Sequence, residues 1–252
     1  MSGYRIFSQF YDNLTFNVDY EKRAEYLQSI LSLWGHEPGL ALDLACGTGS
    51  LTVALKQRGW DIFGVDGSQD MLTVAMDKAY EKELNMLFLC QRMEKLDLYG
   101  TIDTCVCTLD SLNHITDQAK LQTAFDRVAL FMNPEGLFVF DVNTVYKHQR
   151  ILADNTFVYD TDEVYCVWQN SLEENNIVRI ELDLFEKEGE VYLRRSECFR
   201  ERAYEIGELK RMLTQAGFET LAVYRDMTTE PLRDDSDRAV FVARIVDVKN
   251  AE

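Results

Sequence analysis

The stretch LDLACGTGSL (residues 42–51) joins an apolar run, a carboxylate and a glycine turn. Asp43 stands near the end of the apolar run, and Gly47 and Gly49 form the turn that leads into a segment of helical composition. Burying a carboxylate costs free energy unless it finds a partner. Glycine weakens the start of a helix but lets a backbone approach a ligand closely. The stretch therefore predicts a strand, a loop and a helix that together bind a ligand.

Outward from this stretch, from about residue 20, helical and strand patterns alternate along the chain. The predicted strands are 40–45, 61–66, 86–90, 103–109, 137–142, 218–226 and 239–246, and the predicted helices are 20–35, 48–58, 68–84, 117–132 and 206–217, with a turn at 133–136. Strands that are apolar throughout are typical of a parallel sheet covered on both faces. We predict an α/β fold with a doubly wound, seven-stranded, mostly parallel sheet, whose ligand binds beyond the carboxyl ends of the strands.

Residues 145–203 depart from this alternation. They form long β-rich segments joined by the turn-like sequences EENN and EKEGE, a pattern that indicates an antiparallel meander. We predict one domain made of residues 1–144 and 204–252, and an inserted antiparallel β subdomain at 145–203. The insertion is expected to act as a lid or a substrate wall, and a structural flap without substrate contact is the alternative.

Composition narrows the class of protein. The 252 residues, 46% of them hydrophobic, fit one large domain with an insertion, and a net charge of −17 disfavours nucleic acid or an anionic membrane as the partner. No apolar run reaches the length of a membrane span, and the N-terminus lacks the pattern of a secretory signal, so we expect a cytoplasmic protein.

The cysteines and histidines predict neither disulfides nor a metal site. The cysteines are expected to be buried free thiols because none of them forms a Cys-x-x-Cys pair; they are Cys46, Cys90, Cys105, Cys107, Cys166 and Cys198. The chain has only three histidines, and they lack the spacing of metal ligands.

The glycine loop and a second acid point to a nucleoside. Asp66 ends the second predicted strand, where a carboxylate can accept hydrogen bonds from ribose hydroxyls. A dinucleotide site would carry a third small residue, but this chain has Thr52 there, and Asp43 would repel a pyrophosphate. S-adenosyl-L-methionine carries a sulfonium and an ammonium beside its adenosine, so an acid below the loop would attract it. We therefore expect this cofactor.

Four segments resemble a known family. LDLACGTGSL, FGVDGSQDML, LCQRMEKL and TLDSLNHI are similar, in order and spacing, to the motifs of class I S-adenosylmethionine-dependent methyltransferases. YRIFSQFYDNL, LFVFDVNT and YEIGELKRMLTQAGF resemble a bacterial small-molecule branch of that family. The resemblance covers nearly the whole chain. It implies a Rossmann-like methyltransferase fold, S-adenosyl-L-methionine as cofactor and a small-molecule acceptor.

The resemblance also implies roles for individual residues. The cofactor-binding positions that it implies are Tyr11, Asp43, Ala45, Gly47, Gly49, Asp66, Met71, Arg92, Met93, Leu109 and Asp110. The loop with Asp43 would hold the methionine part, Asp66 the ribose, and Met71 and Met93 the adenine. Leu109 and Asp110 would lie beside the ammonium or the transferring methyl, and Tyr11 would fold over the cofactor.

Arg92 departs from the family pattern, which usually has an acid at this position. Arginine has only hydrogen-bond donors, so its side chain cannot accept from the adenine amino group. The backbone of Arg92 and Met93 could still pair with the ring, and the guanidinium could stack or form an ion pair with Glu94.

For catalysis, methyl transfer requires a nucleophile held in line with the methyl group, and a base if the acceptor carries a proton to be removed. His114 is the candidate base because it follows the fourth predicted strand, and a structural or exposed histidine is the alternative. His148 and Tyr146 are further candidates, and Asn113 could orient an acceptor. The arginines of one strand face could bind an acidic acceptor or pair with nearby glutamates; they are Arg194, Arg200 and Arg202.

These patterns leave competing hypotheses. The first is a methyltransferase that acts on an unidentified small molecule. The second is a non-catalytic sensor or partner-binding protein that keeps the adenosyl site. The third is a nicotinamide-dependent oxidoreductase, which the missing third glycine disfavours. The sequence does not identify the acceptor or the oligomeric state.

Overall fold

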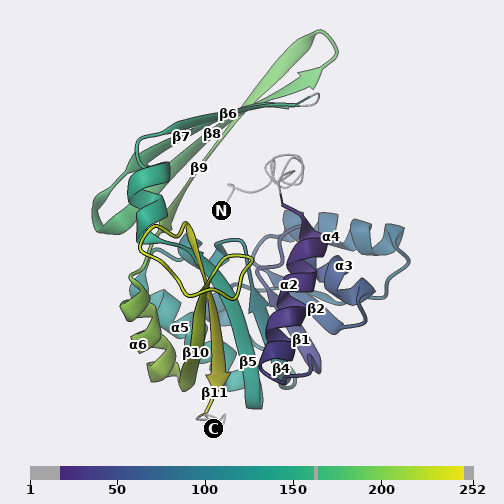
Figure 1. Cartoon of the computed structure of the whole chain (residues 1–252). Helices are drawn as coiled ribbons and strands as arrows, with labels where there is room; N and C mark the ends of the chain where they lie inside the picture. The colour runs from purple at the N-terminus through teal and green to yellow at the C-terminus, as the bar shows by residue number, and fades with distance from the viewer. Residues whose placement is uncertain (1–17, 162–163, 247–252) are drawn as a thin grey trace.

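The computed structural model describes residues 18–161 and 164–246 and contains two sheets. The larger sheet has the strand order β10-β11-β5-β4-β1-β2-β3 (Figure 1). Its strands are β1 (Leu40–Leu44), β2 (Asp61–Asp66), β3 (Phe88–Cys90), β4 (Ile102–Cys107), β5 (Met132–Asn143), β10 (Phe218–Arg225) and β11 (Arg238–Ile245). Strands β1 to β5 pair in parallel, whereas β11 runs antiparallel to both β5 and β10. The predicted seven-stranded, mostly parallel sheet is confirmed.

Helices cover both faces of this sheet. The long helices are α2 (Tyr20–Leu33), α3 (Ser50–Gln57), α4 (Gln69–Glu81), α5 (Gln118–Phe131) and α6 (Ile206–Ala216). Side chains of α2 and α3 pack with Leu137 and Val139 on one face, and side chains of α5 and α6 pack with Phe138 and Phe140 on the other. Alternate residues of β5 thus enter different cores, as the two-residue period of a strand requires. This double burial explains the uniformly apolar strand sequences.

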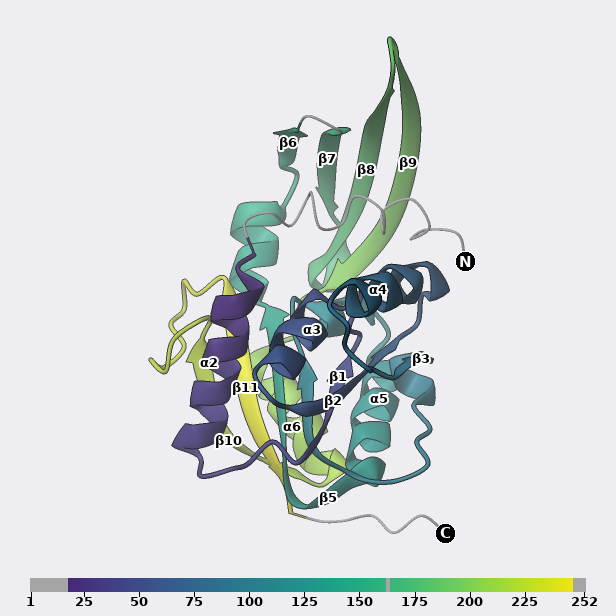
Figure 2. The ribbon, with the colours of Figure 1, turned by 90° about the vertical axis from the view of Figure 1, so that its right-hand side faces the viewer.

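The second sheet is antiparallel and follows β5 in the chain. Its strands, in the order β6-β7-β8-β9, are β6 (Thr156–Asp160), β7 (Val164–Leu172), β8 (Ile177–Glu188) and β9 (Val191–Arg202). The short helix η3 (Lys147–Leu152) leads into it, and η4 (Glu174–Asn176) joins β7 to β8. The sheet stands beyond the carboxyl ends of the parallel strands, and the β8–β9 hairpin projects farther than β6 and β7 (Figures 1 and 2). One apolar cluster contains buried side chains of this sheet together with Met71 of α4.

Several local expectations are wrong. The sequence predicted three strands for the meander, and β6 was missed. The expected turn at 133–136 lies inside β5, where Glu135 has a φ of 64° and the register against β4 shifts between Ile102 and Thr104. The cysteines are free thiols, but Cys90 and Cys198 are exposed rather than buried. In the part of the chain that the structure describes, no helix has the length and apolarity needed to cross a membrane.

Candidate functional site

The loop between β1 and α3 turns through left-handed backbone conformations. Ala45, Gly47 and Gly49 have φ values of 60°, 55° and 73°. The Cys46 N–H donates to the Val65 carbonyl at 3.0 Å, and this hydrogen bond fixes the loop against β2. A Cβ at position 49 would lie 2.8 Å from the Ala75 Cβ of α4, whereas a Cβ at position 47 would meet no atom within 4 Å. Position 49 therefore needs glycine because of both the close contact with α4 and the left-handed backbone conformation. Position 47 needs glycine because of the backbone conformation alone.

Asp43 lies beneath this loop and is only 2% exposed. The Thr52 hydroxyl donates to its Oδ2 at 2.6 Å. Burial raises the pKa of Asp43 to about 7; the Thr52 hydrogen bond opposes this rise, and the nearby Asp66 carboxylate adds to it. A cation next to Asp43 would favour the ionised carboxylate, so this position suits a positively charged ligand.

Asp66 ends β2 with both carboxylate oxygens in hydrogen bonds. Oδ2 accepts from the Gly47 N–H at 2.9 Å, and Oδ1 accepts from the Ser68 N–H at 2.7 Å. Burial raises the pKa of Asp66, and these backbone donors oppose the rise. Since each carboxylate oxygen has more than one lone pair, the carboxylate can still accept further hydrogen bonds in this fixed orientation.

A pocket opens between this loop and the turn that follows β4. Its lining includes Asp43, Ala45, Gly47 and Leu109, which the sequence predicted as cofactor contacts. The remaining lining residues are Tyr20, Cys46, Thr48, Ser50, Leu51, Thr108 and Ser111. None of these described residues is basic, so the wall of the pocket offers the Asp43 carboxyl without a cationic side chain beside it.

The three positions expected at the adenine lie at the ends of β2 and β3. Met71 is buried in α4 and contacts the apolar cluster of the second sheet. Met93 begins the short helix η1 (Met93–Lys95) and packs against the main core. Arg92 is half exposed, and its Nε lies 2.8 Å from Glu94 Oε1, so the ion-pair alternative for this arginine is confirmed. The predicted contact of Tyr11 falls outside the described residues.

The turn after β4 also has an unusual backbone. Leu109 and Asp110 have φ values of 57° and 55°, a conformation that costs non-glycine residues of order 1–3 kcal/mol each. Asp141 of β5 holds the turn, because its carboxylate accepts from the Leu109 N–H at 2.9 Å and the Asp110 N–H at 2.8 Å. Arg238 pairs with both Asp110 and Asp141. Burial alone would raise the pKa of Asp110, but the surrounding positive charges, chiefly Arg238, hold it below its ordinary value.

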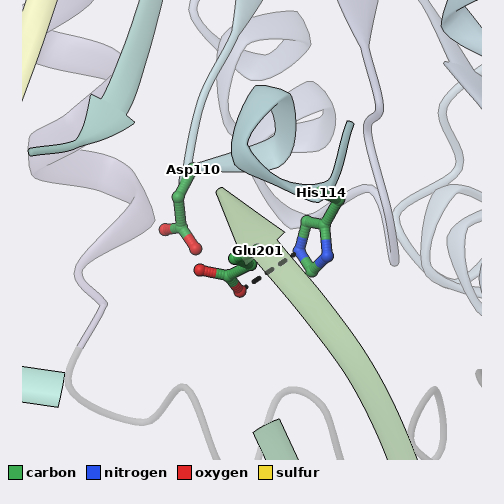
Figure 3. Close-up of side chains that lie close together, drawn as sticks. All are labelled: Asp110, His114 and Glu201. Carbon is green, nitrogen blue, oxygen red and sulfur yellow. Dashed lines mark ion pairs between the residues drawn. The ribbon is translucent and has the colours of Figure 1, made fainter. Parts of the chain in front are cut away.

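His114 ends the short helix η2 (Ser111–His114) and faces a carboxylate from the second sheet (Figure 3). Its Nε2 lies 3.6 Å from Oε1 of Glu201 on β9. Burial lowers the pKa of His114, although Asp110 and Asp66 oppose this effect, so the imidazole is neutral at neutral pH. A neutral imidazole has a lone pair that can accept a proton.

Glu201 is the main functional candidate that the sequence missed. It is 4% exposed, and burial raises its pKa to about 8, with a further rise from Asp110. The residue lies within RRSECFRER, whose alternating charges are typical of a solvent-exposed strand. Only the folding of β9 against η2 brings this carboxyl to His114, so no local signal could have identified it.

Oxygen and nitrogen atoms of Asp110, His114 and Glu201 lie within 4.8 Å of one another, a spacing that a metal ion could bridge. Two cationic side chains already supply positive charge there. Arg238 pairs with Asp110, and Lys147, whose Nζ donates to Asn143 Oδ1 at 2.9 Å, interacts with both carboxyl groups. We therefore assign no metal to these residues.

The other sequence candidates have structural contacts. Asn113 is fully buried, and its Nδ2 donates to the carbonyls of Asn143 and Arg202, so it ties η2 to β5 and β9. His148 is fully buried beside Glu201. The three aligned arginines form ion pairs with acidic side chains, which supports the paired interpretation of that strand face; the pairs are Arg194 with Asp183, Arg200 with Glu173 and Arg202 with Glu208.

Comparison with known proteins gives consistent results. A family model described as a methyltransferase domain matches residues 41–136. A protein of Geobacillus sp. (strain WCH70) that is named a methyltransferase is 32% identical over 244 residues, which are 96% of this chain and 99% of that protein.

Solved structures are similar over the same length. The crystal structure of an S-adenosylmethionine-dependent methyltransferase from Clostridium acetobutylicum ATCC 824 has a TM-score of 0.88 and 30% identity, covering 96% of this chain and 98% of that one. CalS10, an amino pentose methyltransferase from Micromonospora echinaspora, was solved with bound S-adenosylmethionine; it has a TM-score of 0.74 and 17% identity, covering 91% and 92% of the two chains. The likeness to CalS10 is one of fold.

Proposed function

Because the chain belongs to the class I S-adenosylmethionine-dependent methyltransferases, we propose that it transfers the methyl group of this cofactor to a small-molecule acceptor by in-line displacement. Family membership confirms the resemblance, the cofactor and the methyltransferase activity, and it excludes the oxidoreductase hypothesis. It also favours an enzyme over a non-catalytic sensor. The observation that carries the proposal is the pocket over Asp43: Asp66 holds the Gly47 part of its wall, and Ser111 of its wall begins the short helix that ends at His114.

The residues around the pocket fit the cofactor. S-adenosylmethionine supplies a methyl group activated by a positively charged sulfur. We assign Asp43, Ala45 and the Gly47–Gly49 loop to the methionine part, since the buried carboxyl of Asp43 gains from a cation nearby. Asp66, oriented by two backbone N–H groups, would accept from the ribose hydroxyls.

The adenine would lie between apolar side chains and backbone. Met71 and Met93 would pack on the ring. The Arg92 side chain is paired with Glu94, so the backbone at Arg92 and Met93 would read the adenine edge. Leu109 and Asp110 would border the methionine end, and Tyr11 stays a predicted contact.

The acceptor would lie between the carboxyl edge of the main sheet and the second sheet. There the protein has to hold a nucleophile about 3 Å from the methyl carbon, and neutral His114 would remove a proton from it. Residues 145–203 would act as the substrate wall of the domain formed by 1–144 and 204–252, because β9 brings Glu201 and Phe199 to His114. The net charge of −17 and the fold shared with an amino pentose methyltransferase support a small acceptor rather than nucleic acid.

Calorimetry with S-adenosylhomocysteine tests the cofactor site. Asp66→Ala should weaken binding by about 10- to 100-fold, the effect of losing hydrogen bonds to a charged group. Asp61→Ala is the matched control: it changes the exposed first residue of the same strand, whose side chain forms a 3.4 Å ion pair with Lys56 on the surface. Absence of binding by the folded wild-type protein would contradict the proposal.

The acceptor can be sought with labelled S-adenosylmethionine and a fractionated cell extract. We expect the label in the low-molecular-weight fraction. Label found only in protein or nucleic acid would contradict a small-molecule acceptor.

A further inference from the structure

The Glu201 carboxyl lies between two imidazole rings. Its Oε1 is 3.6 Å from His114 Nε2, and its Oε2 is 3.9 Å from His148 Nε2. The three residues come from η2, β9 and η3, so three segments far apart in the sequence meet at this carboxyl. Asn143 Nδ2 also donates to Oε2 at 3.3 Å and orients the group. Glu201 is 4% exposed and His148 is fully buried, so bulk water has little access to these two side chains, whereas the His114 side chain is 30% exposed.

Hydrogen bonding determines the tautomer of His148. Its Nδ1 lies 2.9 Å from the Asn176 carbonyl oxygen, which can only accept, so the hydrogen is on Nδ1. The lone pair is therefore on Nε2, which is buried and makes no hydrogen bond. An unsatisfied buried acceptor costs free energy. Glu201 Oε2 lies 3.9 Å from this nitrogen, and a shorter approach would let a protonated carboxyl donate to it.

We propose that Glu201 and His148 form a proton relay behind His114, which carries the proton of the methyl acceptor away from the site of transfer. The proposal rests on the proposed function, in which His114 is the base. His114 touches the acceptor, whereas Glu201 and His148 are positioning residues that act through it.

The proton balance of the relay is simple. Before transfer, His114 Nε2–H points to Oε1 at 3.6 Å, the carboxyl proton on Oε2 points to His148 Nε2 at 3.9 Å, and Nδ1 of His114 carries the lone pair; both contacts shorten to hydrogen bonds when the relay operates. When the acceptor proton moves to Nδ1, the Nε2 proton moves to Oε1 and the Oε2 proton moves to His148 Nε2. Glu201 remains neutral, His114 returns to a neutral form, and the positive charge is on His148. No oxidant, metal or further reactant takes part.

The charges around the relay are consistent with a protonated Glu201. Burial and Asp110 raise its pKa to about 8, while Lys147, Asn143 and Arg238 oppose the rise. Burial lowers the pKa of His148, and the positive charge of Lys147 lowers it further. The hydrogen bond to the Asn176 carbonyl and the negative charge of Asp110 oppose this decrease. Asp110 and Asp66 are the charged groups that act on His114. At neutral pH both rings are thus neutral and the carboxyl carries the shared proton.

Nitrogen-15 NMR of histidine-labelled protein tests the relay directly. The chain has only three histidines, and His36 is an internal reference because its Nε2 bonds to the Thr104 hydroxyl at 2.9 Å, in another part of the fold. We expect the Nδ1–H tautomer for His148 and the Nε2–H tautomer for His114. The signals of both should share an inflection near pH 8, where Glu201 ionises, and His36 should not show it.

Glu201→Gln keeps the shape of the side chain but removes the titrating proton. The shared inflection should disappear, whereas the protonation midpoints of His114 and His148 should change little, because Glu201 of the wild type is already neutral at the pH where either histidine gains its proton. Glu197→Gln is the control, since Glu197 is another buried carboxyl on the same face of β9. In that variant the shared inflection should remain.

Different outcomes separate this proposal from the proposed function. Independent titration of the two histidines in the wild type, a reversed His148 tautomer, or loss of histidine signals on addition of Mn²⁺ alone would overturn the relay. Failure of the wild type to bind S-adenosylhomocysteine would overturn the proposed function instead. Unchanged S-adenosylhomocysteine binding by Glu201→Gln, together with the altered histidine titration, supports both.

Discussion

Gly47 and Gly49 share a left-handed backbone but differ in their surroundings. Gly49 faces the Ala75 Cβ at a distance that no Cβ tolerates, whereas Gly47 faces open space. The two positions therefore separate the cost of backbone strain from the cost of steric overlap, within a single loop.

Alanine at each position should measure these two costs. Gly47→Ala should lower the free energy of unfolding by about 1–2 kcal/mol, from the left-handed backbone alone. Gly49→Ala should lose a further amount of about 1–3 kcal/mol, because α4 has to move away from the new methyl group. Urea denaturation of both variants checks this order. Equal losses would mean that the loop, not α4, relaxes around the methyl group.

Asp43 makes stability depend on pH. Its pKa is raised to about 7 in the folded protein from an ordinary value of 3.8, so the native state binds more protons than the unfolded state between these values. Stability should therefore fall as pH rises from about 4 to 7, by up to about 4 kcal/mol from this residue. Asp43→Asn should flatten this slope in urea denaturation at several pH values. A slope that persists unchanged in the variant would assign the proton uptake to another group.

At the residue scale, the sequence was informative wherever a role follows from local chemistry. The loop with Asp43, and Asp66 at the end of its strand, could be identified because charge, glycine and strand end are contiguous in the chain. Glu201 could not be identified, and neither could the contacts of Asp141, because their partners come from elements about 30 to 90 residues away in the chain. Arg92 could be assigned to an ion pair because Glu94 is only two residues away.

At the scale of elements, Asp141 joins four parts of the fold. It accepts from the backbone of the turn after β4 and pairs with Arg23 of α2 and Arg238 of β11. Asp226 pairs with the same two arginines, but it is 26% exposed and does not bond the turn in the contacts described. Both carboxylates neutralise the arginines, but Asp141 also holds the turn after β4. Comparing substitutions at the two positions therefore separates these two roles.

Asparagine at these positions should have unequal effects. Asp141→Asn should destabilise the protein by about 1.5–3 kcal/mol, because it removes a fully buried, hydrogen-bonded carboxylate from Arg23 and Arg238, which then keep only Asp226 and Asp110 as partners in the contacts described. It should also weaken S-adenosylhomocysteine binding by disturbing Leu109 and Asp110. Asp226→Asn should cost about 1 kcal/mol and leave binding unchanged. Thermal unfolding and calorimetry on both variants check this. An equal loss of S-adenosylhomocysteine binding in the two variants would show that the hydrogen bonds from Asp141 to the turn do not support binding.

The elements themselves were predictable where the hydrophobic period was strong. Strands β1, β2 and β4 were recognised as apolar runs, and α6 as a helix that ends at Gly217. Strand β6 (Thr156–Asp160) was missed because it is a short edge strand whose alternate residues are exposed. The turn expected at 133–136 lies within β5 as an irregularity: these four residues fall between the pairs Ile102–Met132 and Thr104–Leu137, so the strand continues on both sides of a turn-forming sequence.

At the scale of the whole molecule, a sheet that is buried on both faces and a sheet that is partly exposed to solvent meet at the edge where the cofactor would bind. The central strands β4 and β5 are buried on both faces, whereas the end of the β8–β9 hairpin projects beyond β6 and β7 and exposes Val191 and Tyr192 (Figure 2). The last residues of β9 are nevertheless fixed to the main domain, because Asn113 donates to the Arg202 carbonyl at 2.9 Å. One end of the second sheet is thus anchored beside the site while the other end lies in solvent.

Hydrogen exchange followed by mass spectrometry should report this gradient. Amides of β4 and β5 should exchange slowest, and those between Lys187 and Tyr192 much faster, because among the described strands the latter residues pair across the end of the hairpin and with no third strand. S-adenosylhomocysteine should slow exchange at 45–49, 66–68 and 109–110 and leave β8 and β9 unchanged, since the proposed role of the second sheet is to enclose the acceptor. If S-adenosylhomocysteine alone protected β8 and β9, the second sheet would cover the cofactor rather than form the wall of the acceptor site.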